Sequence, residues 1–154
     1  MSKDKISGSQ AGIAGEYFVA AELSRRGYLC SVTLKNTKGV DILVSNEDSS
    51  KLIGIQVKTT NSSRKRWLLS QKNEDQRQGN FVYVFVNLVG LGGLPEYYIV
   101  SSNDVAEQIT QGHKEWLATP GKRGQQRNDT NMRMFSDLDG EFQNNWSLID
   151  ELLS

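Results

Sequence analysis

The most constraining part of the sequence is residues 39–60, GVDILVSNEDSSKLIGIQVKTT. Two short runs place a β-branched residue at every second position: Val40, Ile42 and Val44, then Ile53, Ile55 and Val57. Side chains alternate between the two faces of a strand, so Gln56 and Lys58 share one face of the second run. The link SNEDSS is rich in turn residues and short enough for a hairpin. The sequence therefore predicts two antiparallel strands.

Burying the two apolar faces together fixes the register of such a hairpin and brings Asp41 toward Gln56 and Lys58. An acid, an amide and an ammonium on one sheet face are unfavourable there unless they bind something. We interpret the three residues as a candidate site. The alternatives are a structural ion pair between Asp41 and Lys58, or a surface lysine on a strand and an aspartate in a turn.

These residues also carry a family resemblance. Asp41, followed by Gln56-Val57-Lys58, resembles the PD-(D/E)xK signature of the restriction-endonuclease-like nuclease superfamily. Upstream, GIAGEYFVAAELSRRGY resembles the first helix of its Holliday-junction-resolvase-like branch, in which a Glu completes the site. The resemblance covers roughly residues 10–100. Val40 stands in place of the signature proline and Gln56 in place of the usual acid, which makes this a QxK variant.

The resemblance implies a fold and a chemistry. The fold is α+β, three-layer α/β/α-like, with a mixed central sheet flanked by helices and an αβββαβ core. The activity is Mg²⁺- or Mn²⁺-dependent DNA cleavage. The implied metal ligands are Asp41, Gln56 through its side-chain oxygen, the Val57 carbonyl, and Glu16 directly or through water. Lys58 is implied to position and polarise the attacking water, and many superfamily members are homodimers.

Glu16 also stands out without the resemblance. Residues 11–26 have a helical pattern ended by Gly27, a residue that favours a left-handed C-terminal cap. Glu16 is the one charge on an otherwise apolar stripe with Ile13, Ala20 and Leu23. The alternative is a glutamate at the edge of the stripe that reaches solvent.

Two basic segments are candidates for phosphate contacts. The first is Arg64-Lys65-Arg66, and the second contains Lys122, Arg123, Arg127 and Arg133. Such contacts give affinity without sequence selection. The alternative for each is a solvated loop. We expect His113 at the surface, and core packing rather than base stacking for Trp67, Trp116 and Trp146.

The remaining pattern predicts strands at 28–34, 67–70, 81–89 and 96–100, and helices at 101–118 and about 142–153. The run 81–89 is continuously apolar, which is typical of a strand covered on both faces. Residues 71–80 predict a loop or a single helical turn, and residues 119–133 a loop. We expect one domain, 1–154, with a flexible arm at 1–10.

Composition limits the function classes. Lys and Arg balance Asp and Glu at 18 each, with a sequence pI of about 6.6. That charge excludes a protein that coats nucleic acid through bulk charge, so DNA contacts depend on local patches. The lone Cys30, the lack of a long apolar run and a polar N-terminus predict a cytoplasmic protein without a membrane segment. The alternatives to a nuclease are a catalytically inactive nuclease-fold module that binds DNA or a protein, and a purely structural or inhibitor-type interaction protein.

Overall fold

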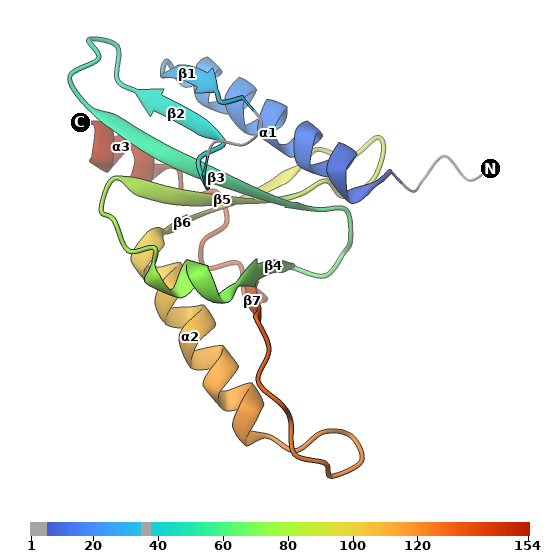
Figure 1. Cartoon of the computed structure of the whole chain (residues 1–154). Helices are drawn as coiled ribbons and strands as arrows, with labels where there is room; N and C mark the ends of the chain where they lie inside the picture. The colour runs from blue at the N-terminus through green and yellow to red at the C-terminus, as the bar shows by residue number, and fades with distance from the viewer. Residues whose placement is uncertain (1–5, 35–37) are drawn as a thin grey trace.

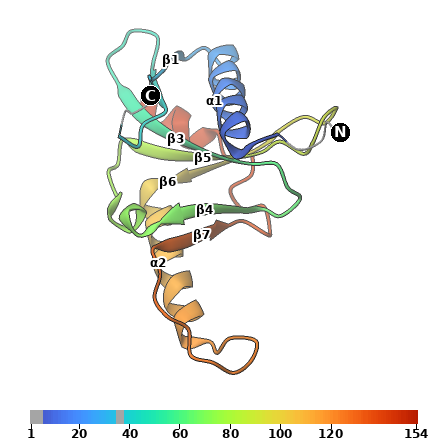
Figure 2. The same cartoon turned by 45° about the vertical axis from the view of Figure 1, so that its right-hand side comes forward.

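The computed structural model describes residues 6–34 and 38–154, which form three layers (Figures 1 and 2). The helices α1 (Gly8–Arg25) and α3 (Ser147–Leu153) cover one face of a five-stranded central sheet. Helix α2 (Ser102–Ala118) and a two-stranded sheet cover the other face. The expected α+β layering with a mixed sheet is confirmed.

The central sheet has the order β1-β2-β3-β5-β6. Its strands are β1 (Leu29–Val32), β2 (Ile42–Ser45), β3 (Leu52–Thr60), β5 (Phe81–Asn87) and β6 (Glu96–Ser101). The predicted hairpin is present, because β2 and β3 pair antiparallel with Ile42 opposite Ile55 and Val44 opposite Ile53. Strand β3 pairs parallel with β5, so the chain must cross over between them.

The crossover differs from the helix of the expected αβββαβ core. It consists of strand β4 (Arg66–Ser70) and the short 3₁₀ helix η1 (Gln71–Asp75). The sequence QKNEDQRQGN has no apolar stripe, so a longer helix here would have no face to bury. The alternative of a single helical turn is the one observed.

Strand β5 lies between β3 and β6 and is covered on both faces, as its apolar run predicted. All seven of its residues are buried. Val82, Val84 and Val86 pack against the α1 side, in the first core cluster. Phe81, Tyr83 and Phe85 pack against the α2 side, in the second cluster. A strand with both faces covered is apolar along most of its length. The polar exception is Asn87 at the end of β5, which donates a hydrogen bond to Glu96.

Strand β4 pairs with β7 (Met132–Ser136) to form a ribbon beneath the central sheet (Figure 2). Trp67, Leu69 and Phe135 face the core, whereas Leu68, Met132 and Met134 are exposed on the outer face. The ribbon corrects the prediction of a loop through residue 133. Arg133 is a charged residue at an inward-facing position, so β7 lacks the alternation of apolar and polar residues that would have predicted a strand.

The N-terminal expectations need one further correction. Helix α1 begins at Gly8, so residues 8–10 are not part of an arm. Ser7 Oγ accepts a hydrogen bond from the Gln10 N–H, and the Gln10 side chain accepts one from the Ser7 N–H, each at 3.1 Å. This capping box satisfies two N–H groups at the start of the helix. Residues 1–5 of the predicted arm lie outside the described residues.

The other boundaries shift by a few residues. Strand β1 is shorter than predicted, and the closing helix begins only at Ser147. Gly27 has a φ of +93°, which confirms the left-handed end of α1. Within residues 6–34 and 38–154, no helix has the length and apolar character needed to cross a membrane.

Candidate active site

Asp41 is held rigidly just before β2 begins. Its N–H donates to the Ile55 carbonyl at 2.8 Å, and its carbonyl accepts from the Thr33 N–H at 2.9 Å. Its side-chain Oδ2 accepts from the Val57 N–H at 2.7 Å. The other oxygen, Oδ1, accepts no hydrogen bond from the described residues. Asp41 is therefore fixed by both neighbouring strands and keeps one oxygen for a ligand.

Asp41 and Lys58 lie close enough to interact electrostatically, and both are half-buried. Burial raises the pKa of Asp41, although the Val57 N–H and the Lys58 charge oppose that rise. Burial lowers the pKa of Lys58, a shift opposed by Asp41 and reinforced by Lys72. In both residues desolvation outweighs the attraction of the partner. Opposite charges that remain this poorly solvated are typical of functional sites.

Gln56 has a structural partner in addition to any ligand role. Its side chain is only 9% exposed and faces the α2 side of β3. Asn73, on η1, donates through Nδ2 to Gln56 Oε1 at 3.4 Å and to the Tyr83 hydroxyl at 2.9 Å. Asn73 Oδ1 accepts from the Ser70 N–H at 3.0 Å. Gln56 thus belongs to a buried neutral network that ties β3 to η1.

Glu16 is half-buried on α1, which packs on β3 and β1. The preceding residue, Gly15, brings the helix unusually close to the strand, because a Cβ there would lie 1.9 Å from Thr59 Oγ1. Thr59 directly follows Lys58. Because successive side chains of a strand point to opposite faces, Thr59 faces α1, whereas Gln56 and Lys58 face the side of the sheet that carries η1. The structure therefore places Glu16 on the α1 side of β3 and Gln56 and Lys58 on the other side.

The donor chemistry fits a hard divalent cation. Asp41, Glu16, Gln56 Oε1 and the Val57 carbonyl are all oxygen donors, which Mg²⁺ and Mn²⁺ prefer. Two of these donors are carboxylates. In the described part of the chain, no three His, Cys, Asp or Glu side chains gather as a ready metal site. A cation here would depend on neutral oxygens as well as acids.

Lys58 opens onto a cavity of about 400 Å³ that we call the lysine pocket. Its lining includes Thr60 at the end of β3, Ser62 and Arg64 in the turn that follows, and Arg66 at the start of β4. Arg64 and Arg66 are exposed, whereas Lys65 is half-buried. The first basic segment therefore places Arg64 and Arg66 in the lining of the pocket onto which Lys58 opens.

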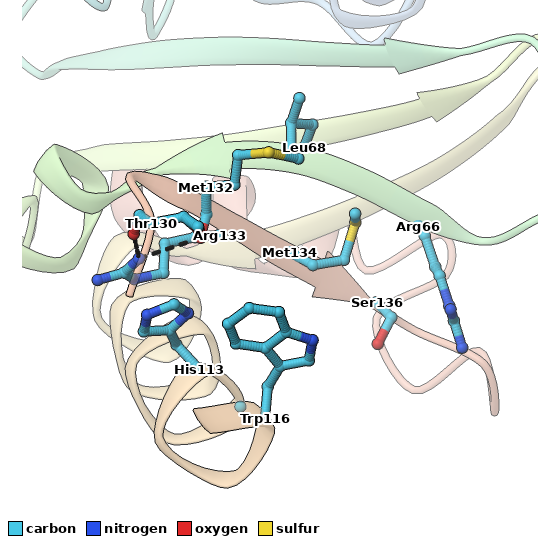
Figure 3. Close-up of a pocket in the computed structure, with 10 residues that line it drawn as sticks. Arg66, Leu68, His113, Trp116, Thr130, Met132, Arg133, Met134 and Ser136 are labelled. Carbon is cyan, nitrogen blue, oxygen red and sulfur yellow. Dashed lines mark hydrogen bonds between the residues drawn. The ribbon is translucent and has the colours of Figure 1, made fainter. Parts of the chain in front are cut away.

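The second basic segment lies along the C-terminal half of α2. Lys122 and Arg123 are exposed in the loop after α2. Arg127 stacks on Trp116, with its guanidinium carbon 4.8 Å from the ring centroid. Trp116 is 40% exposed, so the expectation of core packing is wrong for this tryptophan; Trp67 and Trp146 are buried as predicted. Figure 3 shows Trp116 and His113 on α2, facing the ribbon.

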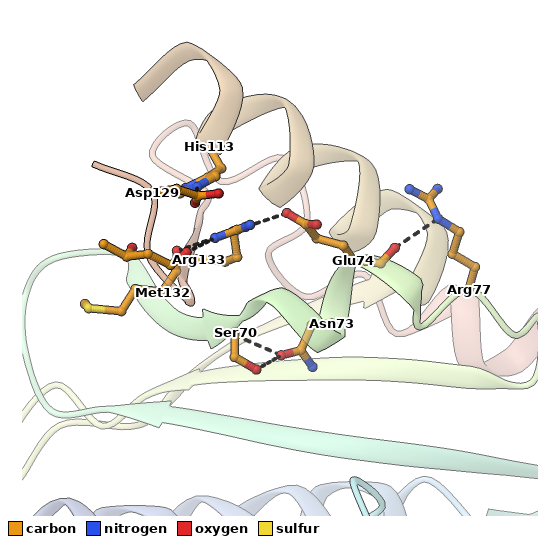
Figure 4. Close-up of polar contacts among 9 residues, drawn as sticks. Ser70, Asn73, Glu74, Arg77, His113, Asp129, Met132 and Arg133 are labelled. Carbon is orange, nitrogen blue, oxygen red and sulfur yellow. Dashed lines mark hydrogen bonds and ion pairs between the residues drawn. The ribbon is translucent and has the colours of Figure 1, made fainter. Parts of the chain in front are cut away.

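Two residues depart from the predicted surface positions (Figure 4). The His113 side chain is only 10% exposed, and its Nε2 lies 2.7 Å from Asp129 Oδ1. Arg133 is buried, pairs with Glu74 and donates to the Thr130 carbonyl at 2.6 Å. Because its guanidinium is satisfied inside the protein, Arg133 does not form part of a phosphate-binding patch.

Sequence reasoning missed Lys72 and Asn73. Both belong to η1, whose polar sequence gives no sign that it packs beside Lys58 and Gln56. The parallel pairing of β3 with β5 forces the crossover onto this face of the sheet. Only that tertiary connection reveals their place near the site.

Neither a protein-family model nor a curated protein sequence matches this chain. Solved structures do match its fold. The bacterial homing endonuclease I-Ssp6803I superimposes with a TM-score of 0.56 at 11% identity, over 96% of this chain and 94% of that one. Hjc, a Holliday junction resolvase of Archaeoglobus fulgidus, an archaeal hyperthermophile, gives a TM-score of 0.50 at 10% identity, over 82% and 84%. The chain has a restriction-endonuclease-like fold. At these sequence identities the similarity establishes the fold, and an activity must be argued from the residues of the site.

Proposed function

We propose that the chain is a divalent-metal-dependent DNA endonuclease that hydrolyses phosphodiester bonds. The observation that supports this most is the pair of Asp41 and Lys58. Burial displaces the pKa of both, and their spacing in the sequence resembles the PD-(D/E)xK signature in a chain with a restriction-endonuclease-like fold. In both residues desolvation outweighs the mutual attraction, so the pair contributes little to stability, and Lys58 opens onto a cavity.

In this proposal each residue has a distinct role. The Lys58 ammonium, open to the lysine pocket, orients the attacking water and offsets charge on the phosphate. Arg64 and Arg66 hold neighbouring phosphates. Asp41 is fixed by the Val57 N–H and holds the cation, together with Glu16, Gln56 and the Val57 carbonyl. The cation, when bound, supplies Lewis-acid stabilisation of the phosphate oxygens.

The second candidate is a catalytically inactive nuclease-fold module that binds DNA or a protein partner. It is favoured by one observation: the neutral Gln56 accepts a hydrogen bond from Asn73 inside a buried network. In a module that descends from a nuclease but has lost its metal site, Gln56 would serve only to pack β3 against η1.

Cleavage and metal binding distinguish the two. We expect wild type to cut at least one of a duplex, a flap, a single strand and a four-way junction in Mg²⁺ or Mn²⁺. Lys58→Ala should lower the rate by roughly 10²- to 10⁴-fold, the usual contribution of a positioned proton-transfer group. Calorimetric Mn²⁺ affinity should not fall in this variant, since Lys58 acts on the water. Lys51→Ala, at the opposite end of β3, is the matched control.

Gln56→Glu provides the decisive comparison for the inactive alternative. The added carboxylate should raise Mn²⁺ affinity, because close charges in a partly dry site interact strongly. If wild type and Gln56→Glu both fail to bind Mn²⁺ and cut none of the substrates, the binding module is the correct assignment.

A further inference from the structure

A second cavity, which we call the tryptophan pocket, adjoins the lysine pocket. It has a volume of about 350 Å³ and lies between α2 and the outer face of the β4–β7 ribbon (Figure 3). The two pockets share Arg66, Leu68 and Met134 in their linings. A molecule bound at Lys58 can therefore continue into the tryptophan pocket without leaving the surface.

The walls of the tryptophan pocket are apolar and exposed. Leu68, Met132, Met134 and Trp116 all contribute, and each is at least 40% exposed. Monomeric proteins rarely leave a group of large apolar side chains this open unless the surface binds something. The Trp116 indole contacts the Arg127 guanidinium and the His113 ring, whose centroid lies 5.5 Å from that of the indole, so a ligand ring would join a cation–π and aromatic group. Methionine thioethers make favourable contacts with aromatic rings. The pocket is chemically suited to a flat heterocycle.

Positive charge stands at both ends of this apolar surface. Arg66 lines one end, next to Lys58, and Arg127 stacks on Trp116 at the other. No acidic side chain among the described residues lines the pocket, although Asp129 accepts from His113 behind it. A flat ring in the middle with anionic groups on either side is the arrangement of a base within a nucleic-acid strand.

A second copy of the chain fits this surface less well. A two-fold contact places the same patch on both partners, so it would bring Arg66 and Arg127 of each copy toward those of the other. The charges at the rim therefore oppose self-association and favour a polyanion.

We propose that the tryptophan pocket binds an unpaired nucleobase of the DNA substrate, stacked on Trp116, next to the phosphate held at Lys58. This inference rests on the proposed nuclease function and specifies its substrate class. The substrate carries an unstacked base beside the cleaved bond, as at a bulge, a flap or a strand end. A fully paired duplex has no free base to offer.

The test measures binding, so it does not depend on cleavage. The probe is a duplex with 2-aminopurine as a one-nucleotide bulge, compared with a duplex in which the same 2-aminopurine is paired. The protein is the full chain carrying Lys58→Ala, which prevents cutting. We expect tighter binding of the bulged duplex and quenching of its fluorescence by stacking. Adding Trp116→Ala should weaken bulge binding by roughly 5- to 150-fold, the range for one base–aromatic stack, and abolish the quenching.

Controls separate the pocket from general effects. Trp116→Leu preserves apolar bulk and should also lose the quenching. Leu52→Ala removes an exposed apolar side chain from the far end of β3 and should leave both measurements unchanged. Thermal unfolding should be similar for all variants, because Trp116 is only partly buried.

Three results would overturn the base pocket: equal affinity for both duplexes, equal weakening of both by Trp116→Ala, or a lower sedimenting mass for the Trp116→Ala variant. The last would identify the surface as an interface between copies. Failure of wild type to cut any substrate would overturn the nuclease function alone, since quenching of the bulged probe is read without cleavage.

Discussion

At the residue scale, the site is built from groups that folding places in unfavourable surroundings. The pKa of Asp41 is raised by burial even though the Lys58 charge and the Val57 N–H oppose the rise. The ionised Asp41 carboxylate therefore lowers the stability of the folded protein when no metal is bound. Functional sites commonly lower stability in this way.

Replacing Asp41 with Asn should raise the thermal unfolding temperature at pH 7 without metal. Asn keeps an oxygen for the Val57 N–H and removes the buried charge. A raised folded-state pKa gives stability that is present at acid pH and lost as pH rises through that pKa. The advantage of the variant should therefore shrink as the pH falls toward the ordinary value of 3.8.

Metal should reverse the order of these two proteins. Excess Mn²⁺ should stabilise wild type and not Asp41→Asn, because only the folded wild type binds the ion. Asp48→Asn is the opposite control, since hydrogen bonds from Ser50 lower the pKa of Asp48 and its charge is favourable above that pKa. A neutral-pH gain in Asp48→Asn, or none in Asp41→Asn, would contradict this account.

At the scale of elements, the contact of α1 with β3 sets the position of Glu16. Gly15 lies against Thr59, with no room for a Cβ. Gly12, one turn earlier on the same helix, has nothing within 4 Å of the position that a Cβ would take. The two glycines differ in packing alone.

The substitutions Gly12→Ala and Gly15→Ala should therefore have opposite effects on the free energy of unfolding. Gly12→Ala should stabilise by roughly 0.5–1 kcal/mol, the helix preference of Ala over Gly. Gly15→Ala should destabilise and also lower cleavage, because the helix must move away from β3 and takes Glu16 with it. Thr59→Ala removes the nearest atom and should partly rescue Gly15→Ala. Equal stabilisation by both alanines in chemical denaturation would disprove the close contact.

At the scale of the whole molecule, positive charge is concentrated in one region of the surface although the net charge is zero. The formal net charge is zero, yet Lys58, Arg64 and Arg66 share one pocket, and Arg66 continues into the tryptophan pocket. DNA affinity should depend on this local concentration of positive charge. The buried Arg133 adds nothing to it.

The double variant Arg64→Gln with Arg66→Gln should flatten the salt dependence of duplex binding. Each lost phosphate contact lowers the slope of log affinity against log salt by about 0.9. The control is Arg25→Gln with Lys51→Gln, which removes the same charge from the end of α1 and the β2–β3 turn. An equal change in both double variants, measured by salt titration, would mean that bulk charge governs binding.

The sequence by itself determined those elements whose formation depends on residues close to one another in the chain. Alternation predicted the β2–β3 hairpin and the pairing of Ile42 and Val44 with β3, and the unbroken apolar run predicted β5. Val40 departs from the pattern, because it packs against the second core cluster and not beside Ile42 and Val44. The same alternation indicated that Asp41 and Lys58 would be close. These predictions succeed because strand parity and turn chemistry act over a few residues.

Tertiary structure alone decided the rest. The pairing of β4 with β7 joins residues more than sixty positions apart and buries Arg133 against Glu74. It also leaves Trp116 open beside the ribbon and brings η1, with Asn73, against Gln56. No short window of sequence contains such contacts. They arise because the parallel β3–β5 pair requires a crossover, which here runs beneath the central sheet. The segments β4, η1, α2 and β7 then cover that face of the sheet.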